Sequence, residues 1–103
     1  MKYGLQDETM HKIRAVFSKF PEVTKAVLYG SRAKGSFKNG SDIDLTLLGG
    51  SDLNLKVLSQ IISEIDDLLL PYTFDLSVLS QISDQAVQDH IQRVGVAIYE
   101  RNT

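Results

Sequence analysis

The stretch GSRAKGSFKNGSDID, residues 30–44, joins a loop of small and basic residues to the start of an apolar run. The run continues as DIDLTL at residues 42–47, where polar and aliphatic residues alternate. Alternation with a period of two is typical of a β-strand with one buried face, so Asp42 and Asp44 are expected to share the other face. The fold is therefore expected to contain a strand that begins with two carboxylates.

These two carboxylates predict a divalent metal site. Two like charges on one strand face repel each other unless a cation lies between them. At a rise of about 3.3 Å per residue their Cα atoms would lie roughly 6 to 7 Å apart. The side chains could then bind one Mg²⁺ ion or bridge two ions about 3.5 to 4 Å apart. Taken alone, such a pair after a turn is most often an ordinary strand entry with exposed carboxylates. A third aspartate on the next strand and the basic loop favour the metal site.

The rest of the chain predicts further helices and strands. Apolar residues recur at helical spacing over residues 6–20, and again from a cap at Ser51 or Asp52 to just before Pro71. The apolar stripe of this second helix consists of Leu55, Leu58, Ile61, Ile62, Ile65, Leu68 and Leu69. The expected elements are a helix at 6–20, strands at 24–29 and 42–47, the second helix, a strand at 72–79, a helix capped by Ser83 and an extended end at 96–99.

The connections between these elements predict the sheet topology. The strand at 24–29 ends where the strand at 42–47 begins, so the two should run antiparallel. A full helix joins the strands at 42–47 and 72–79, which favours a parallel, right-handed crossover. Asp75 would then lie beside Asp42 and Asp44. We expect one α/β domain over residues 1–103, with a mixed sheet of three to four strands flanked by helices.

Composition excludes several classes of protein. With 103 residues, of which 43% are apolar, the chain can form one core but no second lobe. Cysteine is absent, which excludes disulfides and thiolate metal sites. No apolar stretch reaches the roughly 18 residues of a membrane span, and the amino end lacks a secretory signal. We expect a cytoplasmic protein without a membrane partner.

Charge is unevenly distributed along the chain. The formal net charge is −2, which argues against a general nucleic-acid binder. Residues 23–41 nevertheless contain no acid, while Lys25, Arg32, Lys34 and Lys38 are basic. Gly30 and Ser31 could approach a triphosphate, with charge-assisted bonds from the basic side chains, although solvated surface residues would give the same pattern. The roles of Lys34 and Lys38 stay open.

Two other candidate motifs are weaker. Gly30 and Gly35 have the spacing of a P-loop, but Ser36 and Phe37 stand where that motif needs lysine and then serine or threonine. His11 is expected on the surface, and His90 is expected to be half-buried in packing. Neither histidine is assigned a role in the chemistry.

The run Gly30-Ser31, followed after ten residues by Asp42-Ile43-Asp44, resembles the signature of the DNA polymerase beta-like nucleotidyltransferase superfamily. The short chain resembles its minimal nucleotidyltransferase branch. In that family the Gly-Ser pair holds nucleotide phosphates, and the Asp-x-Asp pair binds two Mg²⁺ ions together with a third aspartate. The resemblance implies metal-binding, catalytic roles for Asp42, Asp44 and Asp75, and nucleotide-binding roles for Gly30, Ser31, Arg32, Lys34 and Ser41.

The same resemblance implies a partner. Members of the minimal branch are commonly encoded with a small helical HEPN protein, and the two form a toxin–antitoxin system of the HEPN/MNT type. There the nucleotidyltransferase moves AMP from ATP onto a tyrosine of the toxin. An antitoxin that neutralises its partner by binding alone, with nucleotide as a regulator, explains the small size equally well. A nucleotide-binding module of a larger assembly is a third possibility. The acceptor, the base preference and the oligomeric state are not specified by the sequence.

Overall fold

Four strands form one mixed sheet in the order β3-β2-β1-β4 in the computed structural model, which describes residues 1–101. The strands are β1 (Val23–Tyr29), β2 (Ile43–Gly49), β3 (Phe74–Val78) and β4 (Val96–Glu100). The helices are α1 (Asp7–Ser18), α2 (Gly30–Lys34), α3 (Leu55–Asp66) and α4 (Gln85–Val94), and a 3-10 turn, η1 (Leu79–Gln81), follows β3. These elements confirm the predicted α/β class.

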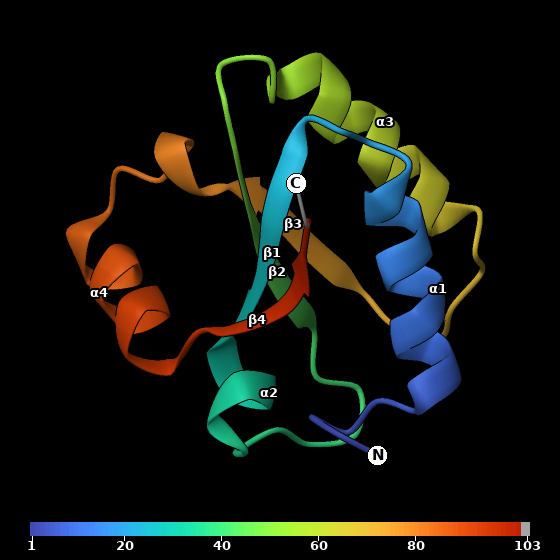
Figure 1. Cartoon of the computed structure of the whole chain (residues 1–103). Coiled ribbons are helices and arrows are strands. Elements are labelled where there is room, and N and C mark those ends of the chain that lie inside the picture. The colour runs from blue at the N-terminus through green and yellow to red at the C-terminus, as the bar shows by residue number, and fades with distance from the viewer. Residues whose placement is uncertain (102–103) are drawn as a thin grey trace.

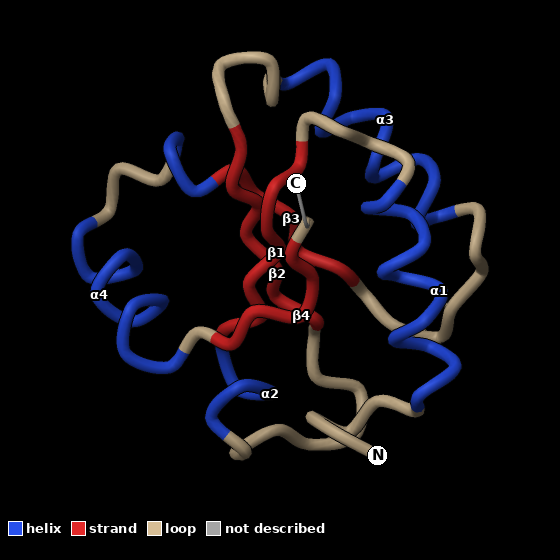
Figure 2. The backbone as a smooth tube through the Cα atoms, in the orientation of Figure 1, coloured by secondary structure: helices blue, strands red, loops and turns tan. Residues whose placement is uncertain are grey.

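The helices divide between the two faces of the sheet. Figure 1 shows α1 and α3 together on one side and α4 on the other, while α2 lies at one end of β1. In Figure 2 the strands occupy the middle of the molecule between these helices. The sheet is therefore the middle layer, and any site on its α4 side is separated from the main core by the sheet itself.

The strand directions agree with the predicted topology. β1 pairs with β2 antiparallel, with Leu28 opposite Leu45. β2 pairs with β3 parallel, with Leu45 opposite Leu76. β2 is thus the central strand at which the sheet changes from antiparallel to parallel pairing. Its two neighbours both bring residues to the end of the sheet where Asp44 lies.

The main core lies between the sheet and the pair α1 and α3. Ile43, Leu45 and Leu47 alternate along β2 and are fully buried there. Thr46 points to the opposite face and is also fully buried, and Ser77 Oγ donates a hydrogen bond to its Oγ1 at 3.0 Å. The hydroxyl of Thr46 therefore has a hydrogen-bond partner although it is buried.

Two helix caps were predicted at the wrong residues. Asn54, not Ser51 or Asp52, caps α3, since its side chain accepts a hydrogen bond from Val57 N at 3.1 Å. The preceding residues instead form a turn that buries Leu53. Asp84, not Ser83, caps α4 by accepting from the amides of the second and third helical residues. All of these residue types accept hydrogen bonds, so the cap depends on where the connecting loop turns.

The buried face of α3 is narrower than predicted. The helix ends at Asp66, and its buried residues are Val57, Ile61 and Ile65. Leu55, Ile62 and Leu69 of the predicted stripe are exposed. The prediction was wrong for Leu55 and Ile62 because apolar side chains extend around more of α3 than the sheet and α1 can cover. It was wrong for Leu69 because that residue lies beyond the end of the helix, where its φ is +54°. The prediction also omitted Val57.

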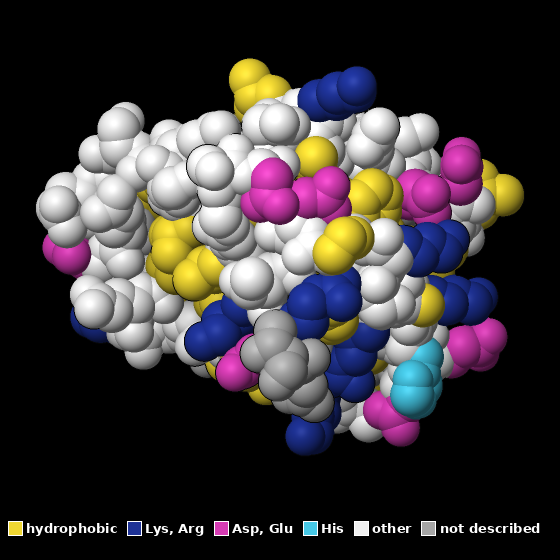
Figure 3. Space-filling model, turned by 45° about the horizontal axis from the view of Figure 1, so that its top comes forward, with side chains coloured by type: hydrophobic (Ala, Val, Ile, Leu, Met, Phe, Trp, Pro, Cys, Tyr) yellow, Lys and Arg dark blue, Asp and Glu magenta, His cyan; other side chains and the backbone are white. Residues whose placement is uncertain are grey.

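The surface carries charges of both signs. On the face drawn in Figure 3, basic side chains gather near the carboxyl end of the chain and acidic side chains lie among them. This mixture agrees with the small net charge of −2. Within residues 1–101, none of the helices combines the length and the apolar character needed to cross a membrane.

Replacing a residue of the central strand tests the core. Leu45 is fully buried, whereas Leu55 of α3 is 65% exposed. Leu45→Ala should lower the free energy of unfolding by about 2 to 5 kcal/mol through lost burial and a cavity. Leu55→Ala should change it by less than about 0.5 kcal/mol. Urea unfolding measures both, and similar losses in the two variants would contradict this assignment of the core.

Candidate active site

Three residues form a row across the polar face of the sheet. Tyr29 of β1 lies opposite Asp44 of β2, and Asp44 lies opposite Asp75 of β3. Side chains of directly opposed residues lie on the same face of a sheet. Asp42 comes one residue before β2 and is exposed, so the strand begins one residue later than predicted. The pairing of β2 with both neighbours thus brings Asp75 beside Asp44.

The carboxylates of this row influence one another. Burial raises the pKa of Asp44 above its usual value, and the nearby charges of Asp75 and then Asp42 raise it further. A positive charge on His90 would act in the opposite direction on the pKa of Asp44. The ionised form of Asp44 is therefore disfavoured by its surroundings, and a bound cation would relieve the repulsion.

The aspartates do not by themselves form a complete metal site. Within the described part of the chain, no group of three or more aspartate, glutamate or histidine side chains is arranged to hold a metal ion. Mg²⁺ in proteins commonly takes one or two carboxylates and completes its coordination with water and substrate phosphates. The chemistry of the donor set fits Mg²⁺, provided that a phosphate supplies the remaining oxygens.

Gly30 provides the space into which Asp44 fits. Its φ of +75° lies in the left-handed region, and it is the first residue of α2, directly after β1. A Cβ atom placed on Gly30 would lie 2.1 Å from Asp44 Oδ2. Glycine is therefore required here both by the backbone conformation and by the close approach of the carboxylate. The Gly30-Ser31 turn and Asp44 are consequently direct neighbours.

Arg32 is buried and tied to the backbone. It is only 3% exposed, and its Nε and Nη2 donate to the carbonyl oxygen of Ser41 at 3.1 and 2.8 Å. Its Nη1 donates to the carbonyl oxygen of Tyr3 at 2.9 Å. The guanidinium also lies 5.4 Å from the ring centre of Phe37 and 5.2 Å from that of Tyr72. This geometry gives Arg32 and Ser41 a structural role in holding the loop after α2.

The other predicted nucleotide-binding residues are more accessible. Ser31 is partly exposed at the start of α2, and Lys34 is exposed in its last turn. Lys38 is exposed in the loop, where its backbone N–H donates to Ser41 Oγ at 2.8 Å. Of the three basic residues, Lys34 and Lys38 therefore extend into solvent, whereas Arg32 does not.

His90 lies at the site, although no sequence pattern predicts this. It is half-buried on α4, as predicted, but its Nε2 accepts a hydrogen bond from Gly30 N at 3.1 Å. Its ring meets that of Tyr29 edge-on, with 6.2 Å between centroids. A single histidine among the apolar residues of a helix carries no sequence signal for such a contact. Only the packing of α4 over β1 reveals it.

The hydroxyl of Tyr29 lies in the same cluster. Burial raises the pKa of Tyr29, a hydrogen bond with Ser77 lowers it, and the charges of Asp75 and Asp44 raise it again. Tyr29 therefore stays protonated at neutral pH and contributes a neutral polar group beside the carboxylates.

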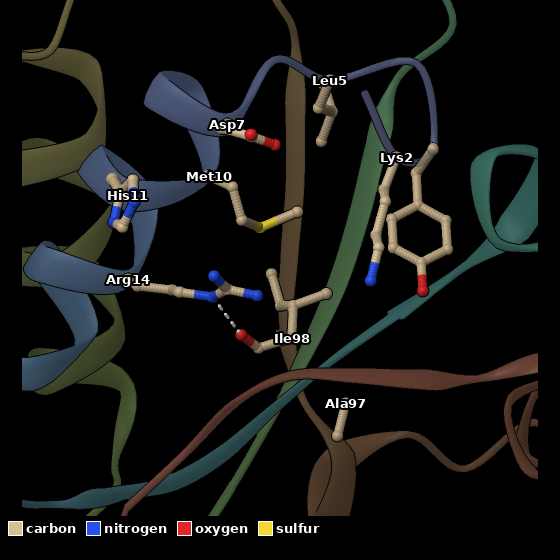
Figure 4. Close-up of a pocket in the computed structure, with 9 residues that line it drawn as sticks. Lys2, Leu5, Asp7, Met10, His11, Arg14, Ala97 and Ile98 are labelled. Atoms are coloured by element: carbon tan, nitrogen blue, oxygen red, sulfur yellow. Dashed lines mark hydrogen bonds between the residues drawn. The ribbon is translucent and has the colours of Figure 1, made fainter.

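A separate pocket lies at the amino end of the chain. Figure 4 shows Arg14 extending from α1 toward Ile98 of β4, whose carbonyl oxygen accepts from Arg14 Nε at 2.7 Å. The pocket has a volume of about 260 Å³ and is lined by Lys2, Tyr3, Leu5, Asp7, Met10, His11, Arg14, Ala97 and Ile98. It shares no residue with the row of Tyr29, Asp44 and Asp75. This hydrogen bond joins α1 to the edge strand β4.

Comparison with protein families identifies one match. The model of the family described as "Polymerase beta, Nucleotidyltransferase" matches residues 11–103. The match includes the Gly30-Ser31 turn and all three aspartates. A search among curated proteins finds no match.

Solved structures with a similar fold come from toxin–antitoxin complexes. A chain in the crystal structure of a toxin–antitoxin with AMP-PNP has a TM-score of 0.70 and 18% identity, over 95% of this chain and 76% of that one. A chain of the toxin–antitoxin MntA-HepT gives 0.68 and 18%, over 93% and 74%. A chain from the complex of tri-AMPylated Shewanella oneidensis HEPN toxin with MNT antitoxin gives 0.68 and 17%, over 94% and 74%. At this identity the similarity establishes the fold.

Alanine substitutions at two glycines of left-handed conformation separate the cost of backbone strain from the cost of a steric clash. Gly30 and Gly35 have φ of +75° and +83°, but a Cβ on Gly35 would meet nothing within 4 Å. Gly35→Ala should therefore lose only about 1 to 2 kcal/mol of stability through strain. Gly30→Ala should lose clearly more, because Asp44 must move. Denaturant unfolding measures both, and equal losses would argue against the close packing of Asp44 on Gly30.

The raised pKa of Asp44 predicts how stability depends on pH. Between the unfolded pKa, about 3.9 for an aspartate, and the raised folded pKa, the folded state binds more protons, so stability falls as pH rises through this window. The substitution Asp44→Asn removes this loss of stability, because asparagine does not ionise. The variant should be more stable than wild type at neutral pH without metal, and the gain should disappear below the unfolded pKa. Thermal melting across pH measures it, and a destabilised variant at neutral pH would contradict the assigned repulsion.

Proposed function

This chain belongs to the polymerase beta nucleotidyltransferase family, and from that premise we propose that it moves AMP from ATP onto a tyrosine hydroxyl of a small helical HEPN-type protein. It would thereby act as the antitoxin of a toxin–antitoxin pair. The observation that carries the proposal is the alignment of Asp44 with Asp75 beside the Gly30-Ser31 turn. This places acidic groups next to a turn suited to phosphate.

In the proposed complex, the chain's own residues hold the nucleotide. Ser31 offers its amide and hydroxyl to the triphosphate, and Gly30 allows the backbone to come close. Lys34 and Lys38, both exposed, add charge-assisted bonds to phosphate oxygens. Arg32 acts indirectly by fixing the Ser41 carbonyl, and so the loop, against α2.

Asp42, Asp44 and Asp75 are the proposed ligands of Mg²⁺, and two ions fit the family pattern. When bound, Mg²⁺ would withdraw charge from the α-phosphate and the leaving pyrophosphate. The raised pKa of Asp44 supports this assignment, because clustered carboxylates are unfavourable without a cation.

The transfer itself requires a nucleophile and a proton acceptor. The acceptor tyrosine oxygen attacks the α-phosphorus of ATP in line with the leaving group. A new phosphorus–oxygen bond forms, the bond to the β-phosphate oxygen breaks, and pyrophosphate departs. The tyrosine proton passes to a carboxylate, and Asp75, which is exposed, is the proposed acceptor if it does not bind metal.

The proposal of a HEPN partner is supported by the fold. Similar folds occur in a complex of an MNT antitoxin with an AMPylated HEPN toxin and in a toxin–antitoxin with AMP-PNP. We propose a cytoplasmic location, where ATP is available to such a reaction.

A second candidate function is neutralisation by binding alone. The specific observation that favours it is that the three aspartates are not gathered into a ready metal site within residues 1–101. Under this alternative, nucleotide regulates the complex but no AMP is transferred. Complex formation and neutralisation would then need neither ATP nor Mg²⁺.

Loss of the aspartate pair should abolish transfer. The double variant Asp42→Asn with Asp44→Asn should transfer at least about a hundredfold less AMP, because electrostatic stabilisation at the phosphate is lost. The assay uses ATP labelled at the α-phosphate and a co-encoded HEPN protein. The matched control is Asp66→Asn with Asp67→Asn, an adjacent acidic pair at the end of α3 that is exposed.

The results separate the two candidates. Full activity in the control and none in the site variant supports the enzyme. Undiminished labelling in the site variant rules out the proposed role of the pair. Neutralisation of the partner by the site variant, without nucleotide, supports the binding mechanism.

A further inference from the structure

One hydrogen bond connects α4 to the turn at which β1 becomes α2. The backbone N–H of Gly30 donates to His90 Nε2 at 3.1 Å, across sixty positions of sequence. The carboxylate of Asp44 also packs closely against Gly30, where any other residue would have a Cβ. The imidazole and the carboxylate therefore approach the same glycine, one through the backbone amide and one through the space left by the missing side chain.

The protonation of His90 follows from this contact. An imidazole nitrogen that accepts a hydrogen bond carries a lone pair, so the ring is neutral and its proton lies on Nδ1. A protonated ring or the other tautomer would present an N–H to the N–H of Gly30. The bond thus exists only with one of the two neutral tautomers.

The packing of α4 holds His90 in place. Ile91, the next residue, is buried, and Gly95 at the end of α4 lies so close to β1 that an added Cβ would meet Val27 Cγ1 at 2.8 Å. The His90 ring also rests edge-on against Tyr29. The helix is therefore fixed on β1 near its carboxyl end, and His90 is delivered to Gly30 by a rigid element.

We propose that His90 is a positioning residue for the nucleotide site. By accepting from Gly30 N, it fixes the orientation of the peptide that precedes the left-handed glycine. That orientation determines where the amide and hydroxyl of Ser31 point and keeps the space for Asp44 open. The inference deepens the proposed function and rests on it for the identity of the ligand. The hydrogen bond between His90 and Gly30 is independent of that function.

Two substitutions at this position separate acceptor chemistry from packing. In His90→Gln the side-chain amide oxygen lies about as far from the backbone as Nε2 does and can accept from Gly30 N. In His90→Leu the side chain still fills space but has no hydrogen-bond acceptor. Loss of one hydrogen bond of this kind should weaken binding by about tenfold. His11→Leu on α1 and Gln92→Leu on α4 are the controls, since both residues are exposed.

The experiment measures the dissociation constant of a non-hydrolysable ATP analogue with Mg²⁺, at a temperature where every variant is folded. His90→Leu should bind about tenfold more weakly, His90→Gln should stay within about twofold of wild type, and the controls should be unchanged. Equal weakening in both His90 variants would assign the effect to packing and overturn the proposal. Unchanged binding in His90→Leu would overturn it as well.

A second measurement does not depend on the nucleotide. Nitrogen NMR of the imidazole should show the His90 proton on Nδ1, and the Gly30 amide should exchange with solvent more slowly in wild type and His90→Gln than in His90→Leu. A proton on Nε2 would overturn the proposal. If wild type binds no ATP analogue but the NMR results hold, the proposed function fails while the link between α4 and Gly30 stands.

Discussion

The candidate site depends on the register of β2 with its two neighbours. Antiparallel pairing with β1 places Tyr29 opposite Asp44, and parallel pairing with β3 places Asp75 on the other side. A shift of one residue on either side would turn Asp44 or its neighbour toward the core. Because Ile43, Leu45 and Leu47 are fully buried, the hydrophobic core fixes this register. Burial on one face thus determines the placement of charge on the other.

The features predicted well from sequence were those with strong periodicity or a long connection. The alternation along β2 predicted which side chains share a face, and the helix between β2 and β3 predicted their parallel direction. Together they were enough to bring Asp75 next to Asp44. Caps were predicted less well, because Ser51, Asp52 and Asn54 are all competent acceptors and the turn that buries Leu53 decides among them.

The remaining features of the site depend on contacts between distant segments. Arg32 lies in the same basic stretch as the exposed lysines, yet it is buried, its guanidinium lies close to two aromatic rings, and it donates to two carbonyl oxygens. His90 is remote from Gly30 along the chain and reaches it only because α4 packs on β1. Neither outcome follows from spacing or composition, since both depend on which surfaces meet in the folded molecule.

The carboxylates of Asp42, Asp44 and Asp75 repel one another in the protein alone. In the proposed function a metal ion bound with a nucleotide relieves this repulsion. The most direct test is a crystal structure with a non-hydrolysable ATP analogue and Mn²⁺ in place of Mg²⁺. Anomalous scattering should locate Mn²⁺ between the phosphates and the carboxylates of Asp42, Asp44 and Asp75. A bound analogue whose phosphates lie elsewhere, or metal peaks remote from these carboxylates, would contradict the account.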